Sequence, residues 1–231
     1  MPRRTRFLPI GVPVHVVQRG NNRQIIFESD ADMAAYANWL SEGAQKFGVQ
    51  IHAWVLMTNH VHLLVTPEAD DAISKCIQFL GRYYVRYFNH RFYRTGTLFE
   101  GRFKGHLVQS EQYFLQCCRY MELNPVRAGM VSDPADYRWS SYPAHSFGKR
   151  IAMWSSLSEY EALGNNAQER LTAYRNQFKA ELDQDVLDDI RLAVGTGFVL
   201  GNERFRQQVE VLSGFAQRFQ QRGRPPAARD L

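Results

Sequence analysis

The stretch Ile51-His52-Ala53-Trp54-Val55-Leu56-Met57-Thr58-Asn59-His60-Val61-His62-Leu63-Leu64-Val65 decides the fold of this chain. Most of its residues are β-branched, aromatic or aliphatic, which favours strands, whereas Thr58-Asn59 are residues that form turns. The segment therefore predicts a β-hairpin. Because side chains two positions apart in a strand lie on one face, His60 and His62 are expected to project together, with Val61 on the opposite face.

Two neutral imidazoles on one face can supply half of the ligands of a divalent metal site. The pair alone is weak support for a metal site. A chain of this composition, with seven histidines, contains a His-x-His pair by chance in roughly one case of five. Two partly buried histidines that are satisfied by backbone groups explain the pair alone equally well.

A second pattern follows later in the chain, where a helix is predicted with Ser110 as its N-cap and its end near Pro125. Tyr120 and Asn124 are four residues apart and share one helical face. A tyrosine hydroxyl can act as a covalent nucleophile, and an amide oxygen can bind a metal. Without the histidines, a core tyrosine and an asparagine that ends the helix are favoured. Tyr113 is the only local alternative nucleophile, and we expect it to pack.

Taken together, these residues resemble the single-tyrosine HUH transposases, in particular the branch of REP-associated tyrosine transposases. The resemblance covers residues 8–145 and rests on several motifs in the same order. Besides the two pairs, the motifs are His15-Val16-Val17-Gln18-Arg19-Gly20-Asn21-Asn22-Arg23, Gly101-Arg102-Phe103-Lys104, Asn124-Pro125-Val126-Arg127-Ala128-Gly129 and Trp139-Ser140-Ser141-Tyr142.

The resemblance implies a site in which Tyr120 is the nucleophile and His60, His62 and Asn124 bind Mg²⁺ or Mn²⁺. It implies cleavage and rejoining of single-stranded DNA at palindromic, REP-like hairpins through a 5′-phosphotyrosine intermediate, without a nucleotide cofactor. Two-tyrosine HUH enzymes carry a second tyrosine one helical turn away. This chain has Gln116 and Asn124 at those positions, so the one-tyrosine chemistry is expected.

The net charge of +5 and the pI of about 9.2 point to a polyanionic partner. Arginines and aromatic rings alternate between Arg82 and Lys104, which suits the phosphates and bases of a single strand. A basic amphipathic helix whose rings form core is the alternative, and both interpretations can hold. The residues expected to contact DNA are His15, Arg19, Asn21, Asn22, Arg23, Arg82, Arg86, Arg91, Arg94, Arg102, Lys104 and Arg127.

The predicted elements follow the order βαββαβ, with strands over 12–19 and 103–108, helices over 30–47 and 70–90, and the hairpin between the helices. This order is typical of an α+β, ferredoxin-like antiparallel sheet with helices on one face, as in the HUH endonuclease fold. We expect residues 1–145 to form the transposase domain. Residues 146–231 are expected to form a helical extension with a basic tail.

The extension is predicted to contain helices over 158–182, 185–194 and 202–219, after an irregular connection over 133–156. It could be an auxiliary DNA-binding or docking element, or a cap that covers the sheet. Its tail contains Gly223-Arg224-Pro225, the core of minor-groove AT-hook arms, which an ordinary disordered tail explains as well.

Cys76, Cys117 and Cys118 form no disulfide framework or zinc spacing, so reduced thiols are expected. No signal peptide and no apolar run of membrane-spanning length is seen. We therefore expect a bacterial, cytoplasmic, nucleoid-associated protein that does not bind a membrane. It is expected to act on single-stranded or hairpin DNA as a monomer or homodimer. Two other functions stay open: a non-catalytic protein that binds hairpin DNA or RNA, and a rolling-circle-type replication initiator.

Overall fold

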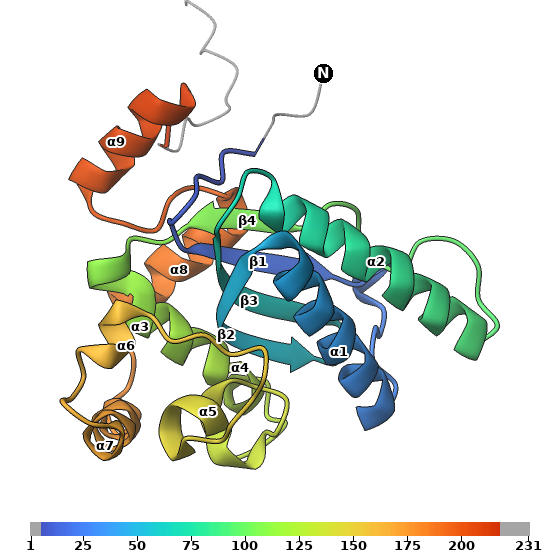
Figure 1. Cartoon of the computed structure of the whole chain (residues 1–231), viewed down its shortest axis with the longest axis horizontal. Coiled ribbons are helices and arrows are strands. Elements are labelled where there is room, and N and C mark those ends of the chain that lie inside the picture. Colours follow the sequence, from blue (N-terminus) through green and yellow to red (C-terminus); the bar gives the residue numbers. More distant parts are fainter. Residues whose placement is uncertain (1–5, 218–231) are drawn as a thin grey trace, which may run out of the picture.

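The computed structural model of the protein describes residues 6–217 (Figure 1). Its centre is an antiparallel sheet in the order β2-β3-β1-β4, which is the ferredoxin-like arrangement that the sequence predicts. The strands are β1 (Val14–Arg19), β2 (Val49–Met57), β3 (His60–Pro67) and β4 (Lys104–Leu107). The helices α1 (Asp30–Phe47) and α2 (Ala72–Arg91) pack on one face.

The predicted hairpin is confirmed, with Met57 of β2 opposite His60 of β3 across the Thr58-Asn59 turn. The other neighbour of β3 is β1, in which Arg19 lies opposite His60 and Val17 opposite His62. Residues opposite each other in an antiparallel pair point to the same face. The histidines and alternate residues of β1 therefore share the face that is turned away from α1 and α2.

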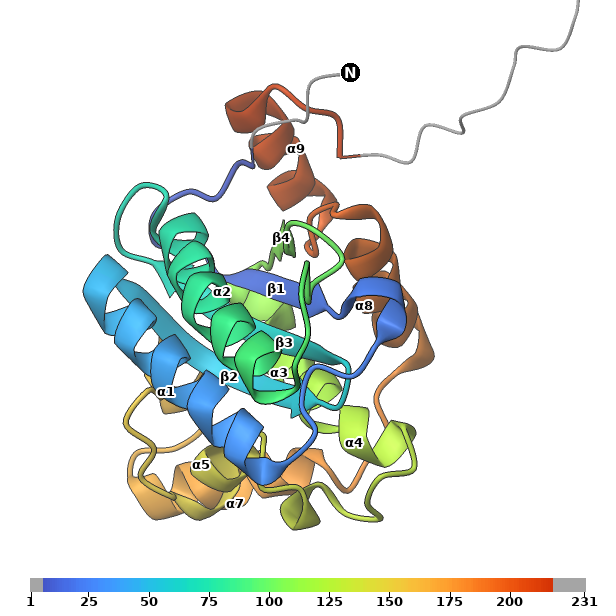
Figure 2. The ribbon, with the colours of Figure 1, turned by 90° about the vertical axis from the view of Figure 1, so that its right-hand side faces the viewer.

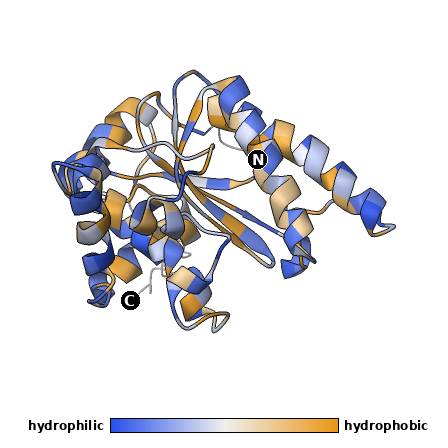
Figure 3. Cartoon of the chain, turned by 60° about the horizontal axis from the view of Figure 1, so that its bottom comes forward, coloured by the Kyte–Doolittle hydropathy of each residue, from blue (hydrophilic) through white to orange (hydrophobic). Residues whose placement is uncertain are grey.

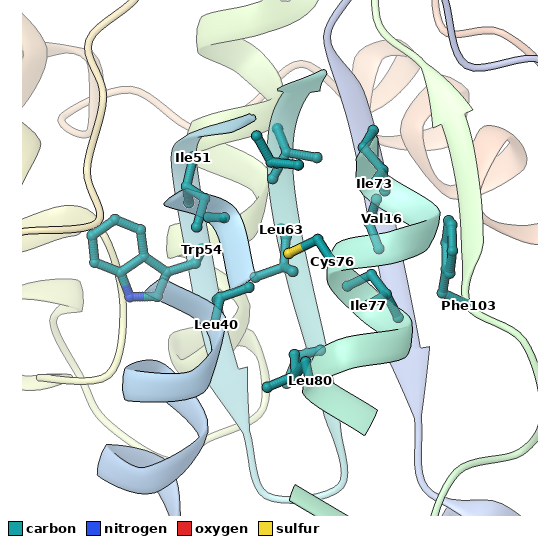
Figure 4. Close-up of a cluster of buried hydrophobic side chains, with 14 of the residues drawn as sticks. Val16, Leu40, Ile51, Trp54, Leu63, Ile73, Cys76, Ile77, Leu80 and Phe103 are labelled. Atoms are coloured by element: carbon teal, nitrogen blue, oxygen red, sulfur yellow. The ribbon is translucent and has the colours of Figure 1, made fainter. Parts of the chain in front are cut away.

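The face under α1 and α2 is filled by apolar side chains of both helices and of the strands (Figure 4). Leu63 of β3 lies under Cys76 of α2, and all three cysteines are buried and free. The start of α1 is fixed by the Asp32 carboxylate, which accepts from the Ser29 N–H at 2.9 Å. Its end is fixed by Gly48, whose φ of 69° is readily adopted only by glycine.

The other face of the sheet is covered by the helix α3 (Ser110–Glu122) and by the C-terminal region, which the sequence left open as a possible cap of the sheet. The helix α3 packs there through Phe114, Cys117 and Met121. Buried residues of the C-terminal region join this second cluster, among them Tyr160, Tyr174 and Ile190. The C-terminal region thus caps the sheet and shares a core with residues before position 145 (Figure 2).

The C-terminal region contains α5 (Tyr142–Phe147), α6 (Ser158–Glu161), α7 (Ala167–Gln177), α8 (Gln184–Thr196) and α9 (Glu203–Ser213). The predicted helix over 158–182 is wrong, because it is broken into α6 and α7. At Gly164 a Cβ atom would come within 2.5 Å of Glu169. Asn166 then caps α7 by accepting from the Glu169 N–H at 3.0 Å. The connection over 133–156 also holds α5 and a 3₁₀ turn, η2 (Pro134–Asp136), which the sequence did not predict.

Figure 3 shows apolar and polar residues side by side on the helices, the pattern of amphipathic helices that pack on a core. Within residues 6–217, no helix combines the length and the hydropathy needed to cross a membrane. Gly223-Arg224-Pro225 and the end of the helix predicted over 202–219 lie outside the described residues.

Candidate active site

Two of the three predicted metal ligands, His60 and His62, lie on the same side of the sheet as the predicted nucleophile. His60 and His62 project from the start of β3, with ring centroids 5.0 Å apart. The ring of Tyr120, on α3, lies 6.2 Å from the ring of His62 and crosses it edge to face. The structure therefore brings together residues that are about 60 positions apart in the sequence.

The hydrogen bond of His60 defines which of its nitrogens carries the proton. Its Nδ1 lies 2.7 Å from the side-chain oxygen of Asn59, which can only accept, so Nδ1–H donates. The amide of Asn59 is held in this orientation because its Nδ2 donates to the carbonyl of Arg23 at 3.1 Å. The Nε2 lone pair of His60 is left for a ligand. Burial, with the charge of Arg19 as a second cause, lowers the pKa of His60 to about 4 and keeps the ring neutral.

His15 occupies a different place from the one expected of a DNA contact. It is 0% exposed, and its Nε2 lies 2.8 Å from Nδ1 of His62. Burial lowers the pKa of both rings well below its usual range, so both are neutral and one nitrogen donates to the other. Metal-binding histidines commonly use one ring nitrogen for such a partner. His15 has no surface for DNA in this structure and instead orients His62.

The end of α3 places Asn124 and Arg127 around Tyr120. A short helix, α4 (Asn124–Arg127), follows α3 directly, and the Arg127 guanidinium lies 4.4 Å from the centroid of the Tyr120 ring. Arg127 Nη2 also donates to the Asn124 side-chain oxygen at 2.8 Å, whereas the Asn124 amide nitrogen is buried without a partner. Burial raises the pKa of Tyr120, and the charge of Arg127 opposes this. The hydroxyl is therefore protonated at neutral pH.

Tyr113, the local alternative nucleophile, is buried on α3 and donates to Asp189 of α8 at 3.3 Å. This contact fixes α8 to α3 and is the packing role expected of Tyr113. Ser110 is the first residue of α3, so the N-cap position falls on Gln109, one residue before the predicted N-cap, and the Gln109 side chain makes no capping hydrogen bond.

A buried network that the sequence did not reveal anchors the end of α3. The Glu122 carboxylate is 0% exposed and accepts from Ser141 Oγ at 2.5 Å, from His145 Nδ1 at 2.7 Å and from the Tyr174 hydroxyl at 2.7 Å. The other ring nitrogen of His145, Nε2, accepts from the indole N–H of Trp154 at 3.2 Å, so Nδ1 is the nitrogen that donates to Glu122. The network ties the helix that carries Tyr120 to α5 and α7.

Removal of the Glu122 carboxylate is expected to lower the unfolding free energy of the protein. Glu122→Ala leaves three buried donors without an acceptor and creates a cavity, which we expect to cost about 3–5 kcal/mol of unfolding free energy. The measurement is the midpoint of urea unfolding. Glu111→Gln, an exposed position in the first turn of the same helix, is the control and is expected to change stability by less than about 0.5 kcal/mol. Equal midpoints for both variants would contradict this role of the network.

The fold separates the basic residues between Arg82 and Lys104 into two groups on different sides of the sheet. Its members on and just after α2 are Arg82, Arg86, Arg91 and Arg94, across the sheet from α3. Arg91 lies 3.5 Å from Asp32, and Arg94 donates to Gln24 at 2.6 Å, so these two make contacts inside the protein. Four rings of this stretch are buried, namely Tyr84, Phe88, Phe99 and Phe103. Tyr87 and Phe92 are partly buried against the same core, and Tyr83 and Tyr93 are exposed. Most of the aromatic rings thus form core and are not available to stack on bases.

The other predicted DNA contacts lie closer to Tyr120. Arg19, Arg102 and Lys104 line a pocket of about 300 Å³ that also contains Tyr120. The exposed residues Asn21, Asn22 and Arg23 form a 3₁₀ turn, η1 (Asn21–Arg23), that is bonded to the β-hairpin turn next to His60. Arg127 is exposed, lies over the Tyr120 ring and does not line this pocket. Arg191 of α8 lines the same pocket and was not among the predicted residues.

Histidine, cysteine and acidic side chains alone do not form a complete metal site in the described residues. In the part of the chain that the structure describes, no group of three or more such side chains could hold a metal ion. The two histidines nevertheless fit one, because each has its Nδ1 engaged and both are neutral. Asn124 would supply an amide oxygen as the third protein ligand, which leaves positions open for a substrate.

The chain is similar in sequence to two curated transposases. The chain is 28% identical over 94 residues to the REP-associated tyrosine transposase of Escherichia coli K12, covering 40% of this chain and 54% of that protein. It is 28% identical over 97 residues to a putative REP-associated tyrosine transposase of Haemophilus influenzae, covering 38% and 55%. The chain spans about half the length of these curated relatives.

A solved structure described as a REP-associated tyrosine transposase bound to a REP hairpin has the same fold. It superposes with a TM-score of 0.54 and 20% sequence identity over 68% of this chain and 93% of that one. The fold is thus that of a tyrosine transposase. Residues 11–124 match the family model "Transposase IS200 like", and the chain belongs to this family, with distant homology to REP-associated tyrosine transposases.

Proposed function

We propose that the protein cleaves and rejoins single-stranded DNA at palindromic hairpins, with Tyr120 as the nucleophile. The observation that carries the proposal is the position of Tyr120, which faces His62 at 6.2 Å between ring centroids and lines a basic pocket. A solved structure with the same fold is described as bound to a REP hairpin, which supports hairpin DNA as the substrate class.

In the proposed reaction, the Tyr120 oxygen attacks a backbone phosphorus, and the bond from that phosphorus to the 3′-oxygen breaks. The products are a 5′-phosphotyrosine and a free 3′-hydroxyl, which takes up a proton. Because one phosphodiester replaces another, rejoining needs no nucleotide cofactor. Burial raises the pKa of Tyr120, so its proton must pass to an acceptor during attack. Lys104 shares the pocket with Tyr120, whereas His106 is buried beside His15.

His60, His62 and Asn124 are the residues that would hold a divalent ion, Mg²⁺ or Mn²⁺ as the family resemblance implies. When bound, such an ion supplies Lewis-acid polarisation of the scissile phosphate. Asn59 and His15 keep Nδ1 of the two histidines engaged, and Arg127 holds the Asn124 oxygen next to Tyr120. Asn59, His15 and Arg127 thus orient the side chains that would bind an ion before any ion is present.

The test compares one DNA sequence in two forms. A hairpin with single-stranded flanks is expected to be cleaved and to form an adduct that survives denaturing electrophoresis, whereas the blunt duplex is not. The physical reason is that a flexible strand can be drawn across the buried hydroxyl, which a stacked duplex resists. Binding should also weaken steeply with salt, since exposed arginines release counterions from the phosphates.

Two outcomes separate this function from the alternatives. Tight binding of the hairpin without any adduct or cleavage, at all metal concentrations, supports a non-catalytic binding protein. Equal affinity and equal cleavage of hairpin and duplex rule out the single-strand mechanism. A replication initiator would share the adduct but would also require a partner that unwinds duplex DNA, so adduct formation on hairpins alone favours the transposase.

A further inference from the structure

The helix α8 lies outside the segment that matches the family and is packed against the helix that carries Tyr120. Ile190 is 0% exposed and Ala193 3% exposed, and both belong to the core around α3. The bond from the Tyr113 hydroxyl to Asp189 adds a polar link between the two helices. In Figures 1 and 2, α8 lies at the β1 and β4 side of the sheet, and it contacts both α3 and β4.

The face of α8 next to this buried face is open to the pocket of Tyr120. Arg191, Val194 and Gly195 line the pocket, and their spacing of three and four residues puts them on one side of the helix. The charged residues of the pocket are four bases and one acid: Arg19, Arg102, Lys104, Arg191 and Glu100. The pocket is therefore an electropositive recess beside the nucleophile, and α8 forms one of its walls.

We propose that Arg191 is a phosphate-binding residue of this site, which holds a backbone phosphate of the single strand next to the one that Tyr120 attacks. This inference rests on the proposed function, since it assigns a role in the same site. The pocket volume of about 300 Å³ is many times the roughly 10–15 Å³ that one water molecule needs, so the pocket can admit a phosphate group. An arginine fork matches two phosphate oxygens at once.

The present partner of Arg191 does not compete strongly with a phosphate. Arg191 Nη1 lies 3.2 Å from Asp188 in an i,i+3 pair whose side chains are 52% and 62% exposed. Such exposed pairs contribute little. The positive charge of Arg191 already acts on the site, because it lowers the pKa of Tyr120 against the larger effect of burial. A phosphate that binds between Arg191 and Lys104 would lie in the pocket that Tyr120 also lines.

Gly195 offers a test that removes no contact. A Cβ atom at this helical position meets nothing within 4 Å, so a longer side chain fits. Gly195→Glu puts a carboxylate on the pocket wall, and Gly195→Gln puts a neutral side chain of the same size there. We expect the Glu variant to bind a hairpin with a single-stranded flank about tenfold more weakly than the Gln variant, with equal unfolding midpoints.

Arg191→Gln is expected to weaken binding of the flanked hairpin by about 5–10-fold and to reduce the salt slope of log K by roughly 0.7, the value of one lost phosphate contact with a single strand. Arg191→Lys should recover part of the affinity. Arg150→Gln, at an exposed arginine that does not line the pocket, controls for net charge and is expected to remain within about twofold of the unmodified protein. Binding of a blunt hairpin without a flank should not change.

The outcomes distinguish this inference from the proposed function. If Arg191→Gln and Gly195→Glu bind the flanked hairpin within twofold of their controls, the phosphate site at α8 is wrong, whether or not the unmodified protein forms an adduct. If both variants lose affinity but the unmodified protein forms no adduct on any hairpin, the phosphate site stands and the chemistry of Tyr120 is wrong. If the unmodified protein does not bind the flanked hairpin at all, both are wrong.

Discussion

Replacement of Tyr120 by Phe is expected to abolish the covalent protein–DNA adduct and strand cleavage, while the fold and the affinity for hairpin DNA remain close to those of the unmodified protein. The substitution removes only the hydroxyl oxygen. The aromatic ring, which belongs to the buried cluster on this side of the sheet and lies 4.4 Å from the Arg127 guanidinium, is kept. Loss of the group that forms the covalent bond should lower the rate by several orders of magnitude, because no other nucleophile shares its position.

The measurement is an adduct that resists denaturing electrophoresis, formed on a flanked hairpin in the presence of Mg²⁺ or Mn²⁺. Tyr113→Phe is the matched control on the same helix. It loses the hydroxyl that donates to Asp189 at 3.3 Å, which should cost about 1 kcal/mol of stability but leave the adduct. If Tyr120→Phe still forms the adduct and Tyr113→Phe does not, the nucleophile is misassigned.

The elements that the sequence predicted well are those with strong local signals. The helix α1 was predicted over 30–47 and is found over Asp30–Phe47, because Ser29 with Asp32 starts it and Gly48 ends it. The hairpin was predicted from β-branched residues around a two-residue turn and is found with that turn. By contrast, the helix expected over 158–182 failed because apolar spacing does not reveal the close approach of Gly164 to Glu169.

The parts of the site that the sequence missed depend on contacts between distant segments. Both His15 and His62 were singled out, but their bond requires the pairing of β1 with β3, in which His15 lies opposite Leu64. Combining the ferredoxin-like strand order with the alternation of side chains could have indicated this contact. Glu122 and Arg191 gave no such signal, because their partners come from helices whose packing the sequence does not specify.

The second large effect is expected for the histidine pair. His60→Ala and His62→Ala should both abolish cleavage and adduct formation, with hairpin affinity within about twofold of the unmodified protein, because affinity comes from the basic residues and the metal acts on the reacting phosphate. The two variants should differ in their unfolding free energy. His62 is 4% exposed, so its loss leaves His15 without a partner and should cost about 1–3 kcal/mol of unfolding free energy.

His60 is the better position for testing the metal role, since its side chain is only partly buried and its Nδ1 bonds to the neighbouring Asn59. Its removal should cost less than about 1 kcal/mol, so a folded variant is expected. Titration of the protein with Mn²⁺, followed by electron paramagnetic resonance of the free ion, should show weaker binding in His60→Ala and no change in Tyr120→Phe. This pattern follows if His60 acts on the metal and Tyr120 acts on the DNA. Folded His60→Ala protein that binds Mn²⁺ and cleaves hairpins at the unmodified rate would refute a metal role for the pair.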